Sequence, residues 1–181
     1  MRVLRRNQNQ SPEENFETLK AIKHRASDAD VDLVAYVSMA FGNPCGDAWS
    51  EGALAEMIGR IVGVGIRSIS LADTVGMADP ELIHRVVVTA LKSSPGSEIG
   101  VHLHSTTAEA AAKILSAYDA GCHRFDSAIG GLGGCPFAQD ALVGNIPTEG
   151  VIAALRQRGL DLPLNIESLL PLNAQIGSEY S

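Results

Sequence analysis

The sequence predicts an α/β fold built from repeated strand–helix units whose strands run parallel. Four short apolar segments begin near residues 31, 66, 99 and 124, and each is followed by a segment of helical periodicity. The repeat is about 30 residues long, the size of one βα unit. The 181-residue chain is 45% hydrophobic, with 18 glycines and only 4% aromatic residues, a composition that suits buried parallel strands.

The first helix is predicted to begin at Ser11. Ser11 is a suitable N-cap, Pro12 suits the first helical position, and Glu14 completes a capping box. The segment from Val31 to Met39 follows as an almost continuous apolar run. Such a run predicts a strand that is buried on both faces.

The rest of the chain alternates in the same way between strands and helices. Strands are predicted at Ile66–Leu71, Ile99–His104 and Arg124–Ala128. Helices are predicted at Ser50–Val62, from Asp79 to the turn at 93–96, from Thr106 or Thr107 to Ala120, from Thr148 to Arg158, and at Asn165–Pro171. Because no linker or low-complexity segment interrupts this alternation, residues 1–181 are predicted to form a single domain.

Two architectures use such units, an α/β barrel and a doubly wound sheet. Four units are half of the eight in a barrel, so this chain would supply a partial barrel, with one leading helix before it.

Charge and composition exclude several classes of partner. The formal net charge of -7 argues against nucleic acid and against an anionic membrane surface, which both favour a basic face. No apolar run reaches the ~18 residues that a membrane span needs. Cys45, Cys122 and Cys135 form a sparse, odd-numbered set, which fits a reducing compartment and predicts a cytoplasmic location.

His102 and His104 are the clearest candidates for metal ligands. Residues two apart in a strand point to the same face, about 6–7 Å apart. Two imidazoles at that spacing can share one metal ion, since histidine is a common metal ligand. The alternative is that both are ordinary strand histidines that face solvent or a hydrogen-bond partner.

Other polar residues follow the predicted strands, where parallel α/β folds place their function. Ser38, Ser70, Thr74 and Asn145 belong to this group, and Asn43-Pro44 there is standard turn chemistry. Asp73 has two interpretations, a local cap on the backbone or a catalytic or substrate-binding role.

A glycine loop follows the last strand, with glycines at 130, 131, 133 and 134. Cys135 follows them directly and precedes Pro136, so its thiol is predicted to be exposed by the loop. We interpret this loop as a mobile lid that carries an acid/base thiol, with a flexible connector as the alternative. The loop has no lysine and no immediate helix start, which disfavours a phosphate-binding role.

These motifs together resemble the 3-hydroxy-3-methylglutaryl-CoA lyases of the DRE-TIM metallolyase superfamily. The resemblance extends from about Asn7 to about Pro171 and rests on Tyr36-Val37-Ser38, Ser70-Leu71-Ala72-Asp73-Thr74-Val75-Gly76, Val101-His102-Leu103-His104 and Gly130-Gly131-Leu132-Gly133-Gly134-Cys135-Pro136-Phe137-Ala138-Gln139. It implies a partial TIM barrel with strands 5–8 of the family barrel. Residues 1–10 would then form the end of strand 4, and residues 165–181 a C-terminal helix and tail.

The resemblance also implies a chemistry. Family lyases use a divalent cation, Mg or Mn, to cleave 3-hydroxy-3-methylglutaryl-CoA, or here a close 3-hydroxy-acyl-CoA, to acetyl-CoA and acetoacetate, a step of leucine catabolism. By the same resemblance the catalytic residues are Cys135, Asp73 and His102, the substrate-binding residues are Asn7, Ser70 and Tyr36, and the metal ligands are His102, His104 and Asn145. Asp73 would shuttle the hydroxyl proton beside His102, and Cys135 would act at the acetyl enolate carbon.

Three departures from the family pattern modify this expectation. First, the Arg-Asp-Glu-like motif of the family's first strand, whose aspartate is a metal ligand, has no match here. Second, Ser105 stands where relatives often have Asp. Third, one extra residue separates Cys135 from Asn145. Two imidazoles and an amide bind a hard dication weakly. We therefore expect this chain alone to bind Mg weakly and to turn over substrate slowly or not at all.

Exposed edge strands would favour association with a missing N-terminal half or with a second copy. Two alternative functions stay open. One is a non-catalytic half-barrel or assembly module, and the other is a sister acyl-CoA condensing synthase, which the Cys135 loop disfavours.

Overall fold

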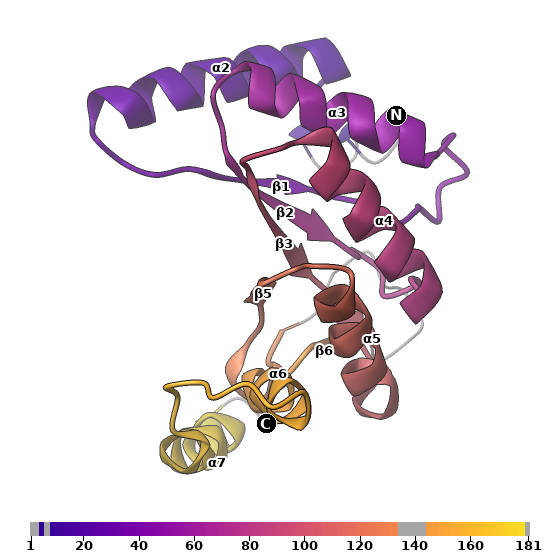
Figure 1. Ribbon diagram of the computed structural model, residues 1–181. Helices are drawn as coiled ribbons and strands as arrows, with labels where there is room; N and C mark the ends of the chain where they lie inside the picture. Colours follow the sequence, from indigo (N-terminus) through magenta and orange to yellow (C-terminus); the bar gives the residue numbers. More distant parts are fainter. Residues whose placement is uncertain (1–3, 6–7, 134–143, 180–181) are drawn as a thin grey trace.

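Four parallel strands form the centre of the computed structural model, which describes residues 4–5, 8–133 and 144–179 (Figure 1). The strands are β1 (Val34–Val37), β2 (Ser68–Ala72), β3 (Glu98–His102) and β5 (Arg124–Asp126), and they lie side by side in chain order. The connecting helices are α3 (Glu51–Gly63), α4 (Pro80–Ser93) and α5 (Thr107–Asp119). The predicted α/β fold with a parallel sheet is confirmed.

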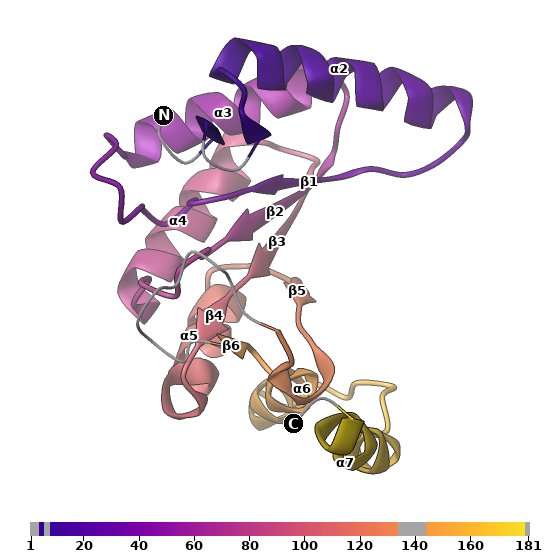
Figure 2. The ribbon, with the colours of Figure 1, turned by 180° about the vertical axis from the view of Figure 1, so that it is seen from behind.

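The order of the strands distinguishes between the two architectures that the sequence left open. Each connection moves one strand further in the same direction, and right-handed crossovers then place every helix on the same face of the sheet. Figures 1 and 2 show α3, α4 and α5 together on one side. A doubly wound sheet reverses direction at a switch point, and the described strands contain no such reversal. The arrangement is typical of a barrel wall.

The helix starts predicted at Ser11, Ser50 and Asp79 are confirmed by side-chain caps, whereas Thr106 precedes α5 (Thr107–Asp119) without a side-chain cap bond. At the start of α2 (Pro12–Asp28), the Ser11 hydroxyl accepts from the Glu14 amide and the Glu14 carboxylate accepts from the Ser11 amide. Ser50 and Asp79 cap α3 and α4 by accepting from backbone amides in the first turn. Such caps satisfy amides that have no partner inside the helix, and each stabilises by about 1 kcal/mol.

The hydrophobic core lies between the sheet and its helices. The large apolar side chains with 0% exposure on α3, β2, α4 and α5 are Ile58, Ile69, Leu71, Ile83, Val86, Val87 and Ile114. Burying one such side chain contributes about 1.5–3 kcal/mol. This layer holds the sheet rigid, so the residues at the strand ends have fixed positions.

The prediction that the first strand is buried on both faces was wrong. Ala35 is buried against the helices, but Val34 and Tyr36 point the other way and are 41% and 53% exposed. The helices cover only one face of the sheet, and the described residues leave Val34 and Tyr36 largely uncovered on the other. An apolar run indicates what a strand prefers to contact, but it carries no information on which elements are present to cover it.

Two other predicted elements differ from the structure. The strand expected at Ile99–His104 is two strands, since β3 ends at His102 and β4 (His104–Ser105) pairs antiparallel with β6 (Gly144–Asn145). Residues 165–171, expected as one short helix, form η2 (Ile166–Ser168) and the start of α7 (Leu169–Glu179). Pro171 lies in the first turn of α7, where a missing amide costs nothing.

The described residues before Ser11 include Leu4, Arg5 and Gln8, and all three have helical backbone. That residues 1–10 correspond to the end of a family strand stays a prediction. Among the helices that the structure describes, none combines the length and apolar character that crossing a bilayer requires. The last helix before η2 is α6 (Thr148–Gln157), which packs against α5.

Candidate functional site

A shallow hollow of about 330 Å³ opens at the carboxyl ends of β1, β2 and β3. Its lining residues are Tyr36, Ser38, Ala72, Thr74, His102, His104 and Asn145. In parallel α/β folds this end of the sheet is where ligands bind. The hollow is therefore the candidate functional site.

His102, His104 and Asn145 are brought together by a contact between the two imidazole rings and by the pairing of β4 with β6. His102 is the last residue of β3, and the centroid of its ring lies 4.9 Å from that of His104, with the two planes at 87°. Asn145 is directly opposite His104 in the β4–β6 pair. The structure thus places the three residues expected to hold a metal at one end of the sheet. Their role as ligands stays a prediction.

The imidazole of His104 has a fixed orientation. Its Nδ1 lies 3.0 Å from the backbone carbonyl oxygen of Asp73, so Nδ1 carries the proton and donates it. The other ring nitrogen, Nε2, then has its lone pair available to bind a metal ion. His104 is 5% exposed, and this burial lowers the pKa of its imidazole, which favours the neutral, ligating form.

Asn145 is oriented by the glycine loop. Its Nδ2 donates to the carbonyl of Leu132 over 2.7 Å, which leaves Oδ1 as the available acceptor. Gly131 and Gly133 have φ of +68° and +87°. A Cβ at Gly131 would lie 2.8 Å from the Asn145 carbonyl oxygen, and one at Gly133 would lie 3.1 Å from Asn145 Nδ2. Only glycine therefore allows this close approach.

Asp73 acts in the structure as a cap on the turn that follows β2. Its carboxylate is 1% exposed and accepts from the Met77 amide over 3.0 Å and from the Ala78 amide over 3.2 Å. Lys113 Nζ lies 3.6 Å from Oδ2. Burial raises the pKa of Asp73, and the charge of Lys113 opposes that rise. Asp73 does not line the hollow, and its expected proton-shuttle role stays a prediction.

Ser70 and Tyr36, the expected substrate contacts, have different environments. Ser70 has 0% exposure, donates to Asp126 Oδ2 over 2.5 Å and does not line the hollow. Tyr36 lines the hollow with its ring edge-on to His102, 6.1 Å between centroids. Burial and the neighbouring Asp126 carboxylate raise the pKa of the Tyr36 phenol.

Arg124 and Asp126 are residues of this region that the sequence analysis missed. Arg124 Nη2 lies 3.2 Å from Asp126 Oδ1, and Nη1 lies 3.3 Å from Glu98 Oε2. The stem of Arg124 crosses Gly100, where an added Cβ would approach it to 3.1 Å. The sequence signal that could have identified them is a pair of opposite charges two residues apart in one strand, because such residues lie on the same face of the sheet.

Asn7 and Cys135, two further expected site residues, lie outside the described residues. Within the ranges that the structure describes, no three His, Cys, Asp or Glu side chains form a group able to hold a metal ion. The donor set at the hollow is instead two imidazoles and one amide oxygen. These are accepted ligands of divalent cations, and His104 and Asn145 each have their second polar atom already hydrogen-bonded, as oriented ligands do. The residues therefore fit a cation, with further positions left for water or substrate.

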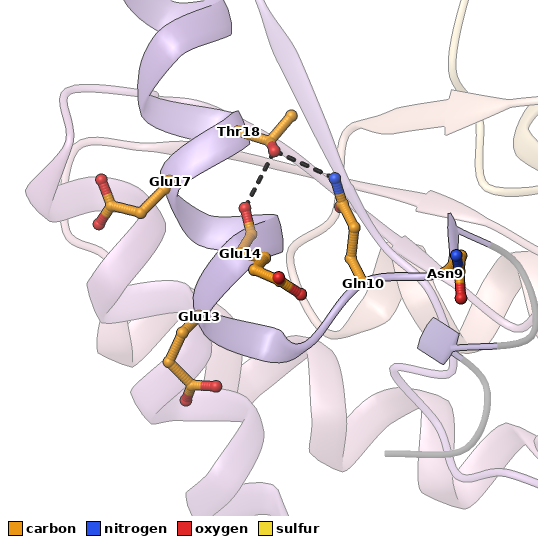
Figure 3. A pocket seen from close by; sticks show the side chains of 6 residues that line it. All are labelled: Asn9, Gln10, Glu13, Glu14, Glu17 and Thr18. Carbon is orange, nitrogen blue, oxygen red and sulfur yellow. Dashed lines mark hydrogen bonds between the residues drawn. The ribbon is translucent and has the colours of Figure 1, made fainter.

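A second hollow of about 520 Å³ lies at the start of α2 and is lined by Asn9, Gln10, Glu13, Glu14, Glu17 and Thr18 (Figure 3). Gln10 Nε2 donates to the Thr18 hydroxyl over 3.2 Å, and Glu14 is committed to the capping box. Figure 3 shows Glu13 and Glu17 pointing away from Gln10. No pair of carboxylates converges there, so this surface lacks the features of an active site.

Comparison with known proteins identifies the family to which the chain belongs. A family model described as HMGL-like matches residues 2–176. The mitochondrial hydroxymethylglutaryl-CoA lyase of Homo sapiens is 34% identical over 166 residues, which are 92% of this chain and 51% of that protein. The HMG-CoA lyase structure from Bacillus subtilis aligns with a TM-score of 0.89 and 31% identity, over 97% of this chain and 58% of that one.

An HMG-CoA lyase from Acinetobacter baumannii, solved in complex with coenzyme A and 3-methylmalate, aligns with a TM-score of 0.85 and 30% identity. That alignment covers 95% of this chain and 56% of the other. The chain thus spans about half the length of the curated relatives it matches. Because the family model covers almost the whole sequence and the fold agrees, the chain belongs to the HMGL-like family.

Proposed function

We propose that this chain provides part of a divalent-metal-dependent carbon–carbon lyase that cleaves 3-hydroxy-3-methylglutaryl-CoA, or a close 3-hydroxy-acyl-CoA, to acetyl-CoA and acetoacetate. The observation that carries the proposal is the hollow at the strand ends, where His102, His104 and Asn145 come together. The relatives named above are lyases, and one was solved with coenzyme A, which supports an acyl-CoA substrate.

His102, His104 and Asn145 would hold the cation, Mg or Mn. When bound, such an ion supplies Lewis-acid polarisation of the substrate's hydroxyl and carboxylate oxygens. The hydrogen bond from His104 Nδ1 to Asp73 keeps Nε2 of that ring available. His102 is half-buried, and its ring lines the hollow beside Tyr36. His102 is thus the imidazole in reach of substrate for a proton transfer, and the phenol of Tyr36 borders the same space.

We also propose that the sheet is a segment of a TIM barrel, equivalent to strands 5–8 of the family. The strand order and the single layer of helices support this. β1 is at one edge of the sheet, and its residues Val34 and Tyr36 are largely exposed on the face away from the helices. Such an edge pairs readily with another strand, from the remaining barrel segment or from a second copy. A cytoplasmic location and a place in leucine catabolism stay predictions.

The association has a direct test. Light scattering after size-exclusion chromatography is expected to give a mass above that of the 19.0 kDa chain, because pairing at β1 would cover Val34 and Tyr36. Replacing Val34 by Lys should shift the mass towards the single chain, since a charge at an edge opposes pairing. Replacing the exposed Leu172 by Lys is the control. A well-behaved monomer of the unaltered chain would contradict the association.

Titration of Mn²⁺ into the full chain tests the lyase proposal, together with an assay for acetoacetate. Saturable binding weaker than micromolar is expected, because no anionic oxygen from the described residues joins the two imidazoles and the amide. Acetoacetate release is expected to be slow and to require the metal. Absence of saturable binding to the folded chain would favour the non-catalytic half-barrel, and net consumption of acetyl-CoA would favour the condensing synthase.

A further inference from the structure

Lys113 is a buried charge that the proposed function does not use. Its side chain is 4% exposed, and it lies on the buried stripe of α5 with Ala110, Ile114 and Ala117. A charge in such a position is costly unless it is paired and hydrogen-bonded. The partners of its ammonium group therefore decide what it does in the structure.

The ammonium group of Lys113 joins two separate pieces of the site. Nζ donates to the carbonyl of Gly76 over 2.9 Å and to the carbonyl of His104 over 3.1 Å. Asp73 Oδ2 lies 3.6 Å from the same atom. Gly76 and Asp73 belong to the turn after β2, whereas His104 belongs to β4. Figure 2 shows α5 beside β4, and the two hydrogen bonds of Lys113 link the turn to that strand.

The same two pieces meet a second time at the imidazole of His104. His104 Nδ1 donates to the backbone carbonyl of Asp73, and the Asp73 carboxylate accepts from the amides of Met77 and Ala78 and forms an ion pair with Lys113. Lys113, Asp73 and His104 thus form a closed ring of contacts. Because the ammonium group of Lys113 binds both the turn and β4, it supports the hydrogen bond between the Asp73 carbonyl and the His104 imidazole.

We propose that Lys113 is a positioning residue that fixes the tautomer and orientation of the His104 imidazole. Without the ammonium group, the carbonyls of Gly76 and His104 lose their shared donor, and the turn is no longer held against β4. Nδ1–H then loses a fixed acceptor, and both neutral tautomers become populated. The consequence for metal binding rests on the proposed function, whereas the tautomer does not.

Nitrogen NMR of histidine side chains in the metal-free full chain tests the proposal. Long-range ¹H–¹⁵N spectra distinguish a protonated from an unprotonated ring nitrogen, and His104→Gln identifies the His104 signals. The unaltered chain is expected to show Nδ1–H with an unprotonated Nε2. Lys113→Met, which keeps the length of the side chain, is expected to give a mixture of tautomers. Lys92→Met, at an exposed lysine of α4, is the matched control and should change nothing.

Two results would overturn the proposal. One is an Nε2–H tautomer in the unaltered chain, and the other is an unchanged His104 tautomer in folded Lys113→Met. Because that variant leaves the Asp73 carboxylate buried without its cation, it can unfold. The double variant Lys113→Met with Asp73→Asn removes both charges and keeps an acceptor for the Met77 and Ala78 amides. A mixed tautomer there supports the proposal; the original tautomer would show that only charge balance matters and would overturn it.

Mn²⁺ affinity separates this inference from the proposed function. If both hold, Lys113→Met should weaken binding by about 10–100-fold, as loss of a residue that orients a ligand does, while Lys92→Met should not. Unchanged affinity in folded Lys113→Met would contradict the positioning role. If the unaltered chain binds no Mn²⁺, the proposed metal site fails, and the tautomer spectra still decide the role of Lys113.

Discussion

Replacing Asp73 by Ala is expected to lower the free energy of unfolding by about 3–5 kcal/mol, the cost of breaking a buried ion pair from one side. The change leaves the ammonium group of Lys113, 4% exposed, without its carboxylate. It also removes the acceptor for the Met77 and Ala78 amides that close the turn after β2. Urea denaturation followed by circular dichroism gives the value.

The ion pair between Asp119 and Arg158 supplies a matched control, because its side chains are 43% and 45% exposed. Solvent screens such a pair, so Asp119→Ala should cost less than about 1 kcal/mol. Equal losses for Asp73→Ala and Asp119→Ala would contradict the view that Asp73 is a buried structural centre. They would favour a carboxylate that is accessible and available for proton transfer.

Replacing His104 by Ala is expected to weaken Mn²⁺ binding strongly, because an imidazole ligand itself is lost. Loss of a residue that only orients a ligand weakens metal binding by about 10–100-fold, and the effect here should be larger. Free Mn²⁺ measured by EPR during a titration gives the affinity. His84→Ala, on the exposed side of α4, should bind as the unaltered chain does. Circular dichroism must show that both variants remain folded.

The outcome for His104→Ala bears on the whole donor set. Because Asn145 is opposite His104 in the β4–β6 pair, loss of the imidazole leaves His102 and the Asn145 amide as the remaining proposed ligands among the described residues. Two neutral ligands hold a hard dication poorly. Retained affinity in the folded variant would place the ion elsewhere and would remove the main support for the proposed lyase site.

The elements of the fold were predicted from the sequence where the signal is local. The capping box at Ser11 and the helix starts at Ser50 and Asp79 depend on residues within one turn, so they could be recognised. The burial of β1 and the break between His102 and His104 were not predicted. Both depend on partners distant in the chain, namely the helices that cover one face and the residues of β6.

The candidate site was predictable in part for the same reason. The spacing of His102 and His104 indicated two imidazoles on one side of a strand, whereas Asn145 was suggested only by resemblance to a family. Its approach to His104 results from an antiparallel pair formed 41 residues further along. Lys113 was overlooked, although a charge on the buried stripe of α5 was a usable signal.

The proposed metal site has a spectroscopic signature in the unaltered chain. Pulsed EPR of bound Mn²⁺ detects magnetic coupling to ligating nitrogen nuclei, and labelling the histidines with ¹⁵N identifies them as imidazole. Coupling to two histidine nitrogens is expected in the unaltered chain and to one in His104→Ala, because the rings of His102 and His104 lie 4.9 Å apart at one hollow. A spectrum of Mn²⁺ surrounded by water alone, with no nitrogen coupling in the folded chain, would contradict the site.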